Sequence, residues 1–279
     1  MTTADVLAGS REKLSRAREH TGLLQSEIEA FIRGFFVADV KYKLTFIATE
    51  SATRAGVSGN TIPRVHMDIP IPALRWGVIV GDAVHGLRSA LDNAIESLTI
   101  ENAGAPLPRT SFPIFPDQTA YARKNRVGAP ARGSGLEAIR GVAPTVASVV
   151  ERAQPYHAAL PRVDPLRLLH ELSNLDKHRV PAIVAIYSEL PGVGLAREIE
   201  PRPGDFDESR ILPFEEGLKH VAAVTKGDGK GDSVRMEFKT QTLFGPGPAE
   251  GEVVVGTIRA MTQRVQEILD ELAAVSKPK

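Results

Sequence analysis

Both ends of the chain carry apolar residues at alternating spacings of three and four, with charged residues between them. This spacing is typical of an amphipathic helix, and a helix over 10–36 would be roughly 40 Å long at about 1.5 Å per residue. Such a helix extends beyond one small core, so we expect helices 10–36 and 253–275 to pack together. The apolar surface left over on them further predicts a homodimer. Their apolar positions are Leu14, Ala17, Thr21, Leu24, Ile28, Phe31 and Phe35, and Val254, Ile258, Met261, Val265, Ile268, Leu272 and Val275.

Between the terminal helices the apolar period changes to two, which is the period of a strand with one buried face. The fold class that we predict is a single α+β domain over 1–279, in which a mostly antiparallel sheet packs against a helical layer with long N- and C-terminal helices. Residues 1–9 and 276–279 would be disordered tails. The expected strands are 40–48, 65–71, 182–189, 193–200, 218–225 and 233–243, with a turn region at 51–61. The expected internal helices are 73–99, 137–153 and 164–178.

The charge balance and the lack of cysteine exclude several classes of protein. Lys plus Arg and Asp plus Glu both number 34, so no field of the whole chain favours nucleic acid or a membrane. The absence of Cys excludes a disulfide scaffold, a thiolate zinc site and a cysteine nucleophile. The motifs of phosphate loops, dinucleotide-binding turns and hydrolase elbows are missing. Short apolar runs and early charged residues predict a cytoplasmic protein with no membrane partner.

The predicted helix over 81–98 has one apolar face and one polar face. Arg88 lies at the seam between them, where a neighbouring helix would pack. One interpretation is a wet surface on which Arg88 and Asp92 form an i,i+4 pair; the other is a functional site. The polar face carries Asp82, His85, Ser89, Asp92, Asn93 and Glu96.

The segment 164–181 is a second amphipathic helix, and it places one carboxylate on the wrong side. On a helical wheel Asp176 falls between Leu169 and Leu172, in the apolar seam, and a buried carboxylate requires a partner. Arg88 and His85 are the expected donors. Clustered Asp, His and Arg at an apolar boundary also favours acid–base chemistry. The candidate catalytic residues are therefore His85, Arg88, Asp92, His170, Asp176 and His178.

Two further sites are open alternatives. Asp82 and His85, joined by His170, Glu171 or His178 from the other helix, would offer ligands for a divalent metal, although no HExxH motif occurs. No other cofactor is predicted. The stretch 123–140 carries five basic residues against Glu137 alone, so it is either a solvated loop or a phosphate-binding one. Its candidate nucleic-acid-binding residues are Arg123, Lys124, Arg126 and Arg132.

Five motifs occur in order along the chain: GDAVHGLRSALDN (81–93), FPIF (112–115), QPY (154–156), LLHELSNLDKHR (168–179) and VVVGTIRAMTQRVQEIL (253–269). Together they resemble a bacterial family of uncharacterised proteins, in which the first motif reads like HNLRSALDH and another ends in DKHR. The spacing from Arg88 onward is similar to the Arg, four residues, His signature of HEPN domains. These are helical proteins that often dimerise, and many cut RNA with that Arg and His.

The resemblance implies that Arg88 steadies a scissile phosphate, but Asn93 stands where the His belongs. Asparagine cannot act as acid or base, so a ribonuclease would have to recruit His85, His170 or His178. Three hypotheses result. The first is a HEPN-like RNA-binding protein or metal-independent ribonuclease, and the second is a small-molecule or metal-binding enzyme with the same cluster. The third is a non-catalytic dimeric protein in which the cluster specifies helix pairing.

Overall fold

The computed structural model describes residues 6–37, 42–53, 56–67, 72–189, 206–211, 219–226 and 234–276, and among them the side chains of 6–31, 72–184 and 242–276. The chain divides into two compact units, which differs from the single domain that the sequence predicts. Unit 1 comprises Met1–Ser26, Ala73–Val184 and Leu243–Lys279, and unit 2 comprises Glu27–Pro72 and Ala185–Thr242.

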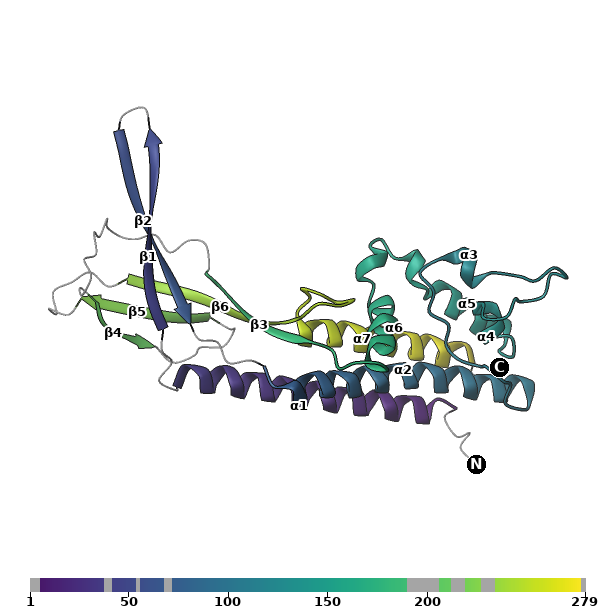
Figure 1. Ribbon diagram of the computed structural model, residues 1–279. Helices are drawn as coiled ribbons and strands as arrows, with labels where there is room; N and C mark the ends of the chain where they lie inside the picture. The colour runs from purple at the N-terminus through teal and green to yellow at the C-terminus, as the bar shows by residue number, and fades with distance from the viewer. Residues whose placement is uncertain are drawn as a thin grey trace. The chain divides into compact units, whose positions relative to one another are not determined.

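Unit 1 is built from helices. Its longest member, α2, begins after the extended residue Ala73 and ends at Gly104, whose positive φ of 73° lets its N–H bond back to the Ile100 carbonyl. The helices of the described chain are α1 (Ala8–Val37), α2 (Leu74–Ala103), α3 (Gln118–Tyr121), α4 (Gly135–Ala138), α5 (Pro144–Arg152), α6 (Pro165–Asp176) and α7 (Val254–Ser276), with 3-10 turns η1 (Pro155–His157) and η2 (Pro161–Val163) (Figure 1).

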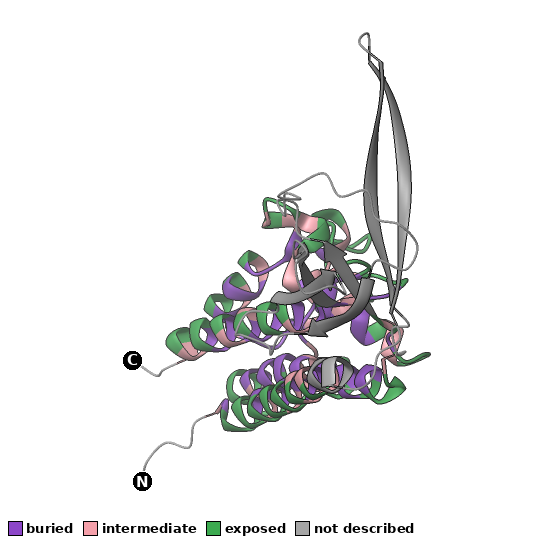
Figure 2. Ribbon diagram, turned by 90° about the vertical axis from the view of Figure 1, so that its left-hand side faces the viewer, coloured by how far each residue is buried: buried purple, intermediate pink, exposed green. Residues whose placement is uncertain are grey.

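The α2 helix is the centre of the core, because α1, α6 and α7 all pack on it. Fourteen of its residues are buried, and Figure 2 shows buried residues on the facing sides of the helices and exposed residues on their outer sides. The first part of α1 runs antiparallel to α2. A Cβ added at Gly86 would lie 3.2 Å from the Cβ of Ala17, so the glycine permits this close approach.

The packing of the terminal helices is confirmed for the part of α1 that belongs to unit 1. Arg18 bonds to Gln266 of α7 at 2.9 Å, and Arg11 lies 3.9 Å from Asp270, which fixes an antiparallel pairing. The α7 stripe from Val254 to Leu272 is buried within unit 1. That stripe therefore leaves no apolar surface for a homodimer, which stays a prediction without this support.

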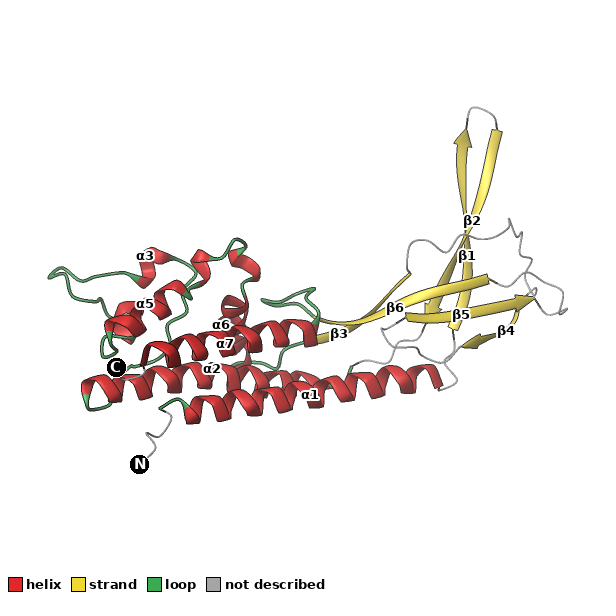
Figure 3. Cartoon of the chain, turned by 180° about the vertical axis from the view of Figure 1, so that it is seen from behind, coloured by secondary structure: helices red, strands yellow, loops and turns green. Residues whose placement is uncertain are grey.

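Several predicted boundaries are correct and others are not. The α6 helix lies within the predicted helix 164–178, whereas the predicted helix 137–153 is divided into α4 and α5, the second of which begins at Pro144. Residues 8 and 9 belong to α1 and Ser276 to α7, so the predicted disordered tails are too long; 1–5 and 277–279 lie outside the described residues. Figure 3, which colours the chain by secondary structure, shows the remaining loops of unit 1 around α3 and α5.

Unit 2 contains the strands. The pair β1 (Tyr42–Thr53) and β2 (Gly56–Met67) is antiparallel from Tyr42↔Met67 to Thr53↔Gly56, so most of the predicted turn region is strand. A second sheet has the order β3-β6-β5-β4. Its strands are β3 (Ile183–Glu189), β4 (Phe206–Ile211), β5 (Lys219–Lys226) and β6 (Val234–Phe244). The β4 strand was not predicted, and the predicted strand 193–200 lies outside the described residues.

The predicted fold class, an α+β domain with a mostly antiparallel sheet packed against a helical layer, is wrong. The part of the chain whose side chains are described is mostly helical, and the core of unit 1 consists of helices packed on helices. The period of two correctly indicates strands, but it carries no information about what packs against a strand. The two terminal helices bury their stripes on α2 and its neighbours instead.

Candidate functional site

The polar residues of α2 form a clamp on a distant backbone segment. Arg88 and Asp92 lie one helical turn apart and share two hydrogen bonds, from Arg88 Nε at 3.1 Å and Nη2 at 2.9 Å. The backbone N–H of Phe112 donates to Asp92 Oδ1 at 3.0 Å, and its carbonyl accepts from Arg88 Nη2 at 2.6 Å. Both backbone polar groups of a fully buried residue are thus satisfied by one ion pair, much as a neighbouring strand would satisfy them.

Gln154 holds the other end of the same segment. Its Oε1 accepts from the N–H of Phe115 at 3.0 Å, and its Nε2 donates to the carbonyls of Pro113 and Val150, both at 2.8 Å. Gln154 itself is 2% exposed. The FPIF and QPY motifs and the Arg88–Asp92 pair therefore meet in one hydrogen-bonded unit, which we call the backbone clamp: Arg88, Asp92, Gln154 and residues 112–115.

The backbone clamp gives Arg88 a structural task. Its side chain is 18% exposed and that of Asp92 is 35% exposed, so the pair is partly shielded from water. Two of the three guanidinium nitrogens are committed to Asp92 and Phe112. The third, Nη1, is buried and has no hydrogen-bond partner within the described part of the chain.

His170 of α6 lies close enough to Arg88 and Asp92 for their charges to affect its pKa. It is half-buried, and its Nε2 lies 3.1 Å from Asn174 Nδ2. Burial, then the positive charges of Arg88 and Lys177, lower the pKa of His170 below its ordinary value. A neutral imidazole at pH 7 is therefore expected here.

Asp176 lies against α2 at Gly81, and it does not form the predicted hydrogen bond with Arg88 or His85. A Cβ added at Gly81 would come within 2.2 Å of Asp176 Oδ1, so the glycine makes room for the carboxylate. The predicted bond from Arg88 or His85 is wrong: Arg88 is committed elsewhere, and no described residue bonds to the Asp176 side chain. Burial, then the nearby charge of Asp82, raise the pKa of Asp176, while His85 lowers it.

The remaining candidates lie outside the backbone clamp, although His85 is close enough to Asp176 to lower its pKa. His85 is exposed and lies 3.4 Å from Ser89 on its own helix, and His178 is exposed beyond the end of α6. Asn93, at the HEPN histidine position, has its Nδ2 4.0 Å from a Cβ added at Gly9 of α1. Within the described part of the chain, no three His, Asp or Glu side chains lie close enough to hold a metal ion, so the proposed Asp82–His85 ligand set is not assembled.

The basic stretch forms an ordered hairpin. Asn125 N–H donates to the Ala129 carbonyl at 2.8 Å, Lys124 pairs with Pro130, and Arg123 donates to the Arg132 carbonyl at 2.8 Å. The Asn125 side chain accepts from two backbone N–H groups at the tip. We call residues 123–132 the basic hairpin.

The cations of the basic hairpin point into solvent. Lys124, Arg126 and Arg132 are exposed, and their side chains have no bond to any residue that the structure describes. Glu137, the one acidic residue of the stretch 123–140, is already occupied by Arg109 at 3.1 Å and by the N–H of Gly133. The positive charge of the hairpin is therefore not neutralised locally.

Comparison with known proteins leaves the fold without a named relative. Neither the protein-family models, nor the curated proteins, nor the solved structures contain a significant match. Within the described chain no helix is long and apolar enough to cross a membrane. No role for Gln154 is predicted from the sequence, although the QPY motif begins with this residue.

Proposed function

We propose that this chain is a non-catalytic RNA-binding protein, in which the basic hairpin contacts phosphates and the polar residues of α2 and α6 serve packing. The observation that carries the proposal is the display of Lys124, Arg126 and Arg132 on a hydrogen-bonded hairpin without an acidic partner in the described chain. Cations held on an ordered backbone bind phosphate oxygens without first losing the entropy of a flexible loop.

The commitment of Arg88 supports the non-catalytic part. A guanidinium that steadies a scissile phosphate must turn donors toward it, yet Arg88 gives Nε and Nη2 to Asp92 and Phe112. Asp92 also neutralises its charge. The backbone clamp thus accounts for two of the clustered side chains, Arg88 and Asp92.

The contacts offered by the basic hairpin are ionic and carry no base recognition. We expect weak sequence preference and strong salt dependence, with a slope of log K against log salt of about −0.7 per phosphate neutralised on a single strand. The test is fluorescence anisotropy of a labelled single-stranded RNA, titrated with the full chain at several salt concentrations.

The variant Lys124→Glu/Arg126→Glu should weaken binding at least about tenfold and reduce the slope by about 1.4, since two contacts are lost. Arg162→Glu/Arg179→Glu is the matched control, because both arginines are exposed and the net charge changes equally. Equal losses in the two variants would show general attraction to the chain, and unchanged binding in the hairpin variant would overturn the proposal.

A second candidate, metal-independent RNA cleavage, is favoured by the buried Nη1 of Arg88, which has no hydrogen-bond partner among the described residues, and by the lowered pKa of nearby His170. In that reaction His170 would take the proton and Arg88 would steady the phosphate. The test is cleavage of the same RNA in EDTA by wild type and by His170→Gln. Product that accumulates with wild type and is lost in the variant would replace the non-catalytic proposal.

A further inference from the structure

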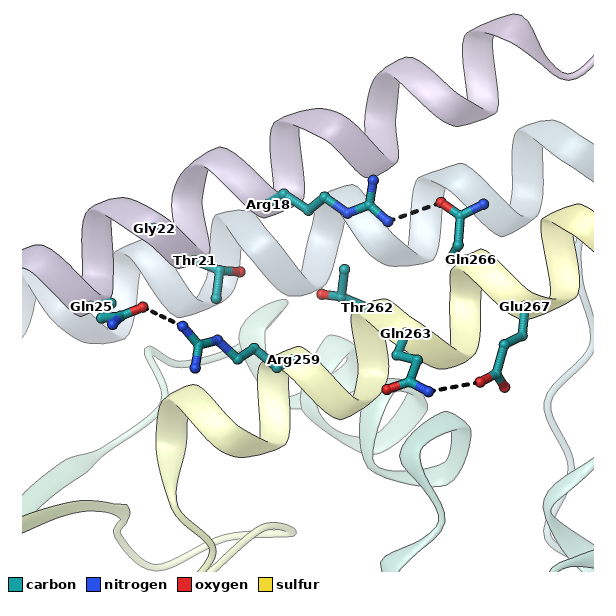
Figure 4. A pocket seen from close by; sticks show the side chains of 9 residues that line it. All are labelled: Arg18, Thr21, Gly22, Gln25, Arg259, Thr262, Gln263, Gln266 and Glu267. Atoms are coloured by element: carbon teal, nitrogen blue, oxygen red, sulfur yellow. Dashed lines mark hydrogen bonds between the residues drawn. The ribbon is translucent and has the colours of Figure 1, made fainter. Parts of the chain in front are cut away.

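A groove of about 490 Å³ lies between α1 and α7, and none of its lining residues belongs to the backbone clamp or the basic hairpin (Figure 4). All of its lining belongs to unit 1. Its volume falls in the range of ordinary small-molecule sites, about 300–1,000 Å³. The lining residues are Arg18, Thr21, Gly22, Gln25, Arg259, Thr262, Gln263, Gln266 and Glu267.

The two walls of the groove repeat one pattern. Each helix carries Arg, then Thr three residues later, then Gln four residues after that: Arg18, Thr21 and Gln25 on α1, and Arg259, Thr262 and Gln266 on α7. Because the helices are antiparallel, each Arg faces the Gln of the other helix. Arg18 bonds to Gln266 at 2.9 Å and Arg259 to Gln25 at 2.5 Å, so the groove has approximate two-fold symmetry.

Each guanidinium is held by a neutral amide oxygen, and neither bonds to a carboxylate in the part of the chain that the structure describes. It is thereby positioned, while its charge stays available for an anion, which would form stronger, charge-assisted and bidentate bonds. In Figure 4 the Arg18 and Arg259 side chains reach in opposite directions along the groove, so their guanidinium groups lie toward its two ends.

The middle of the groove is suited to an uncharged chain. The hydroxyls of Thr21 and Thr262 donate to backbone carbonyls of their own helices, both at 2.8 Å, so their protons are not offered to a ligand. Gly22 leaves open space, with nothing within 4 Å of an added Cβ. The only other charged lining residue is Glu267, which disfavours a ligand with negative charge along its length, such as a polyphosphate.

We propose that this groove binds a linear dicarboxylate, with one carboxylate on Arg18, the other on Arg259, and an aliphatic middle along Thr21, Gly22 and Thr262. Such a ligand has the two-fold symmetry of the site. Its two charged ends can each pair with one guanidinium group, and its uncharged middle matches the lining between them.

The test is isothermal titration calorimetry of the full chain with succinate, adipate, suberate, sebacate and dodecanedioate, each beside the monocarboxylate of equal chain length. The affinity should pass through a maximum at one intermediate chain length, at which both guanidinium groups are engaged, and fall for shorter and longer members. The monocarboxylates should bind at least about tenfold more weakly, because they engage a single guanidinium. Affinity that rises steadily with chain length and is equal for both series would show apolar association and overturn the proposal.

Variants place the ligand in the groove. Arg18→Gln and Arg259→Gln should each weaken the best dicarboxylate about tenfold. Gly22→Leu should abolish binding by filling open space, and leucine is a good helix former, so folding is retained. Arg16→Gln is the matched control, since Arg16 is exposed on the same helix and does not line the groove. Binding that survives Gly22→Leu, or no binding by any member of the series, would identify the Arg–Gln pairs as a register device between helices.

Discussion

Removal of the Asp92 carboxylate tests the backbone clamp most fully. Asp92 accepts two bonds from Arg88 and one from the N–H of Phe112, a residue with no exposed surface. In Asp92→Ala the stranded Phe112 N–H costs about 1–3 kcal/mol. The ion pair is partly exposed, so its loss adds about 0.5–1 kcal/mol. The free energy of unfolding should therefore fall by about 1.5–4 kcal/mol.

The assay is equilibrium denaturation in urea, followed by circular dichroism, for wild type, Asp92→Ala and the control Glu96→Ala. Glu96 is exposed one turn further along α2 and should change stability by less than about 0.5 kcal/mol. If Asp92→Ala has the same midpoint as Glu96→Ala, with an unchanged slope, the pair is a solvated surface feature. The structural role of Arg88 and Asp92 would then be wrong.

Three further predictions follow from the α2–α6 contact. Gly81→Ala should lower the free energy of unfolding by about 1–3 kcal/mol, because the added Cβ meets the Asp176 carboxylate. The control Gly22→Ala adds its Cβ in open space and should raise this free energy by up to about 1 kcal/mol. Equal effects of the two variants in urea denaturation would refute the contact. The pKa of Asp176 is raised on folding, so its stabilising contribution is present below pH 3.8 and is lost as pH rises through the folded pKa. Asp176→Asn should therefore stabilise the chain at pH 7 relative to wild type. A lower urea midpoint for the variant at pH 7 would contradict this. The pKa of His170 is lowered on folding, so stability should fall as pH drops below its ordinary value of 6.5, and the fall should shrink in His170→Gln; an unchanged pH profile would exclude His170 as its source.

The sequence predicts local features well, because they depend on neighbours along one helix. The Arg88–Asp92 pair follows from i,i+4 spacing, and the wheel position of Asp176 correctly indicates a carboxylate at an apolar seam. Their partners could not be predicted. Phe112 lies 20 residues from Asp92 in the sequence, and it is bound through its backbone, which leaves no mark in the side-chain pattern.

The error in fold class has a related cause. Hydrophobic periodicity reports that one face of an element is covered, and the covering partner is chosen by the tertiary structure. Gly81 and Gly86 are the residues that adjust α2 to its partners, one for the Asp176 carboxylate and one for Ala17 of α1. From the sequence, a glycine inside a helix indicates only a possible close approach, without the residue that approaches.

The central claim is that the basic hairpin contacts RNA while the polar faces of α2 and α6 do not. Hydrogen–deuterium exchange of the full chain, with and without a single-stranded RNA, compares the two surfaces in one measurement. If the basic hairpin binds the RNA, exchange should slow in peptides covering 123–132 and stay unchanged in peptides covering 82–92 and 165–178. Protection confined to 82–92 and 165–178, with the hairpin unchanged, would contradict it.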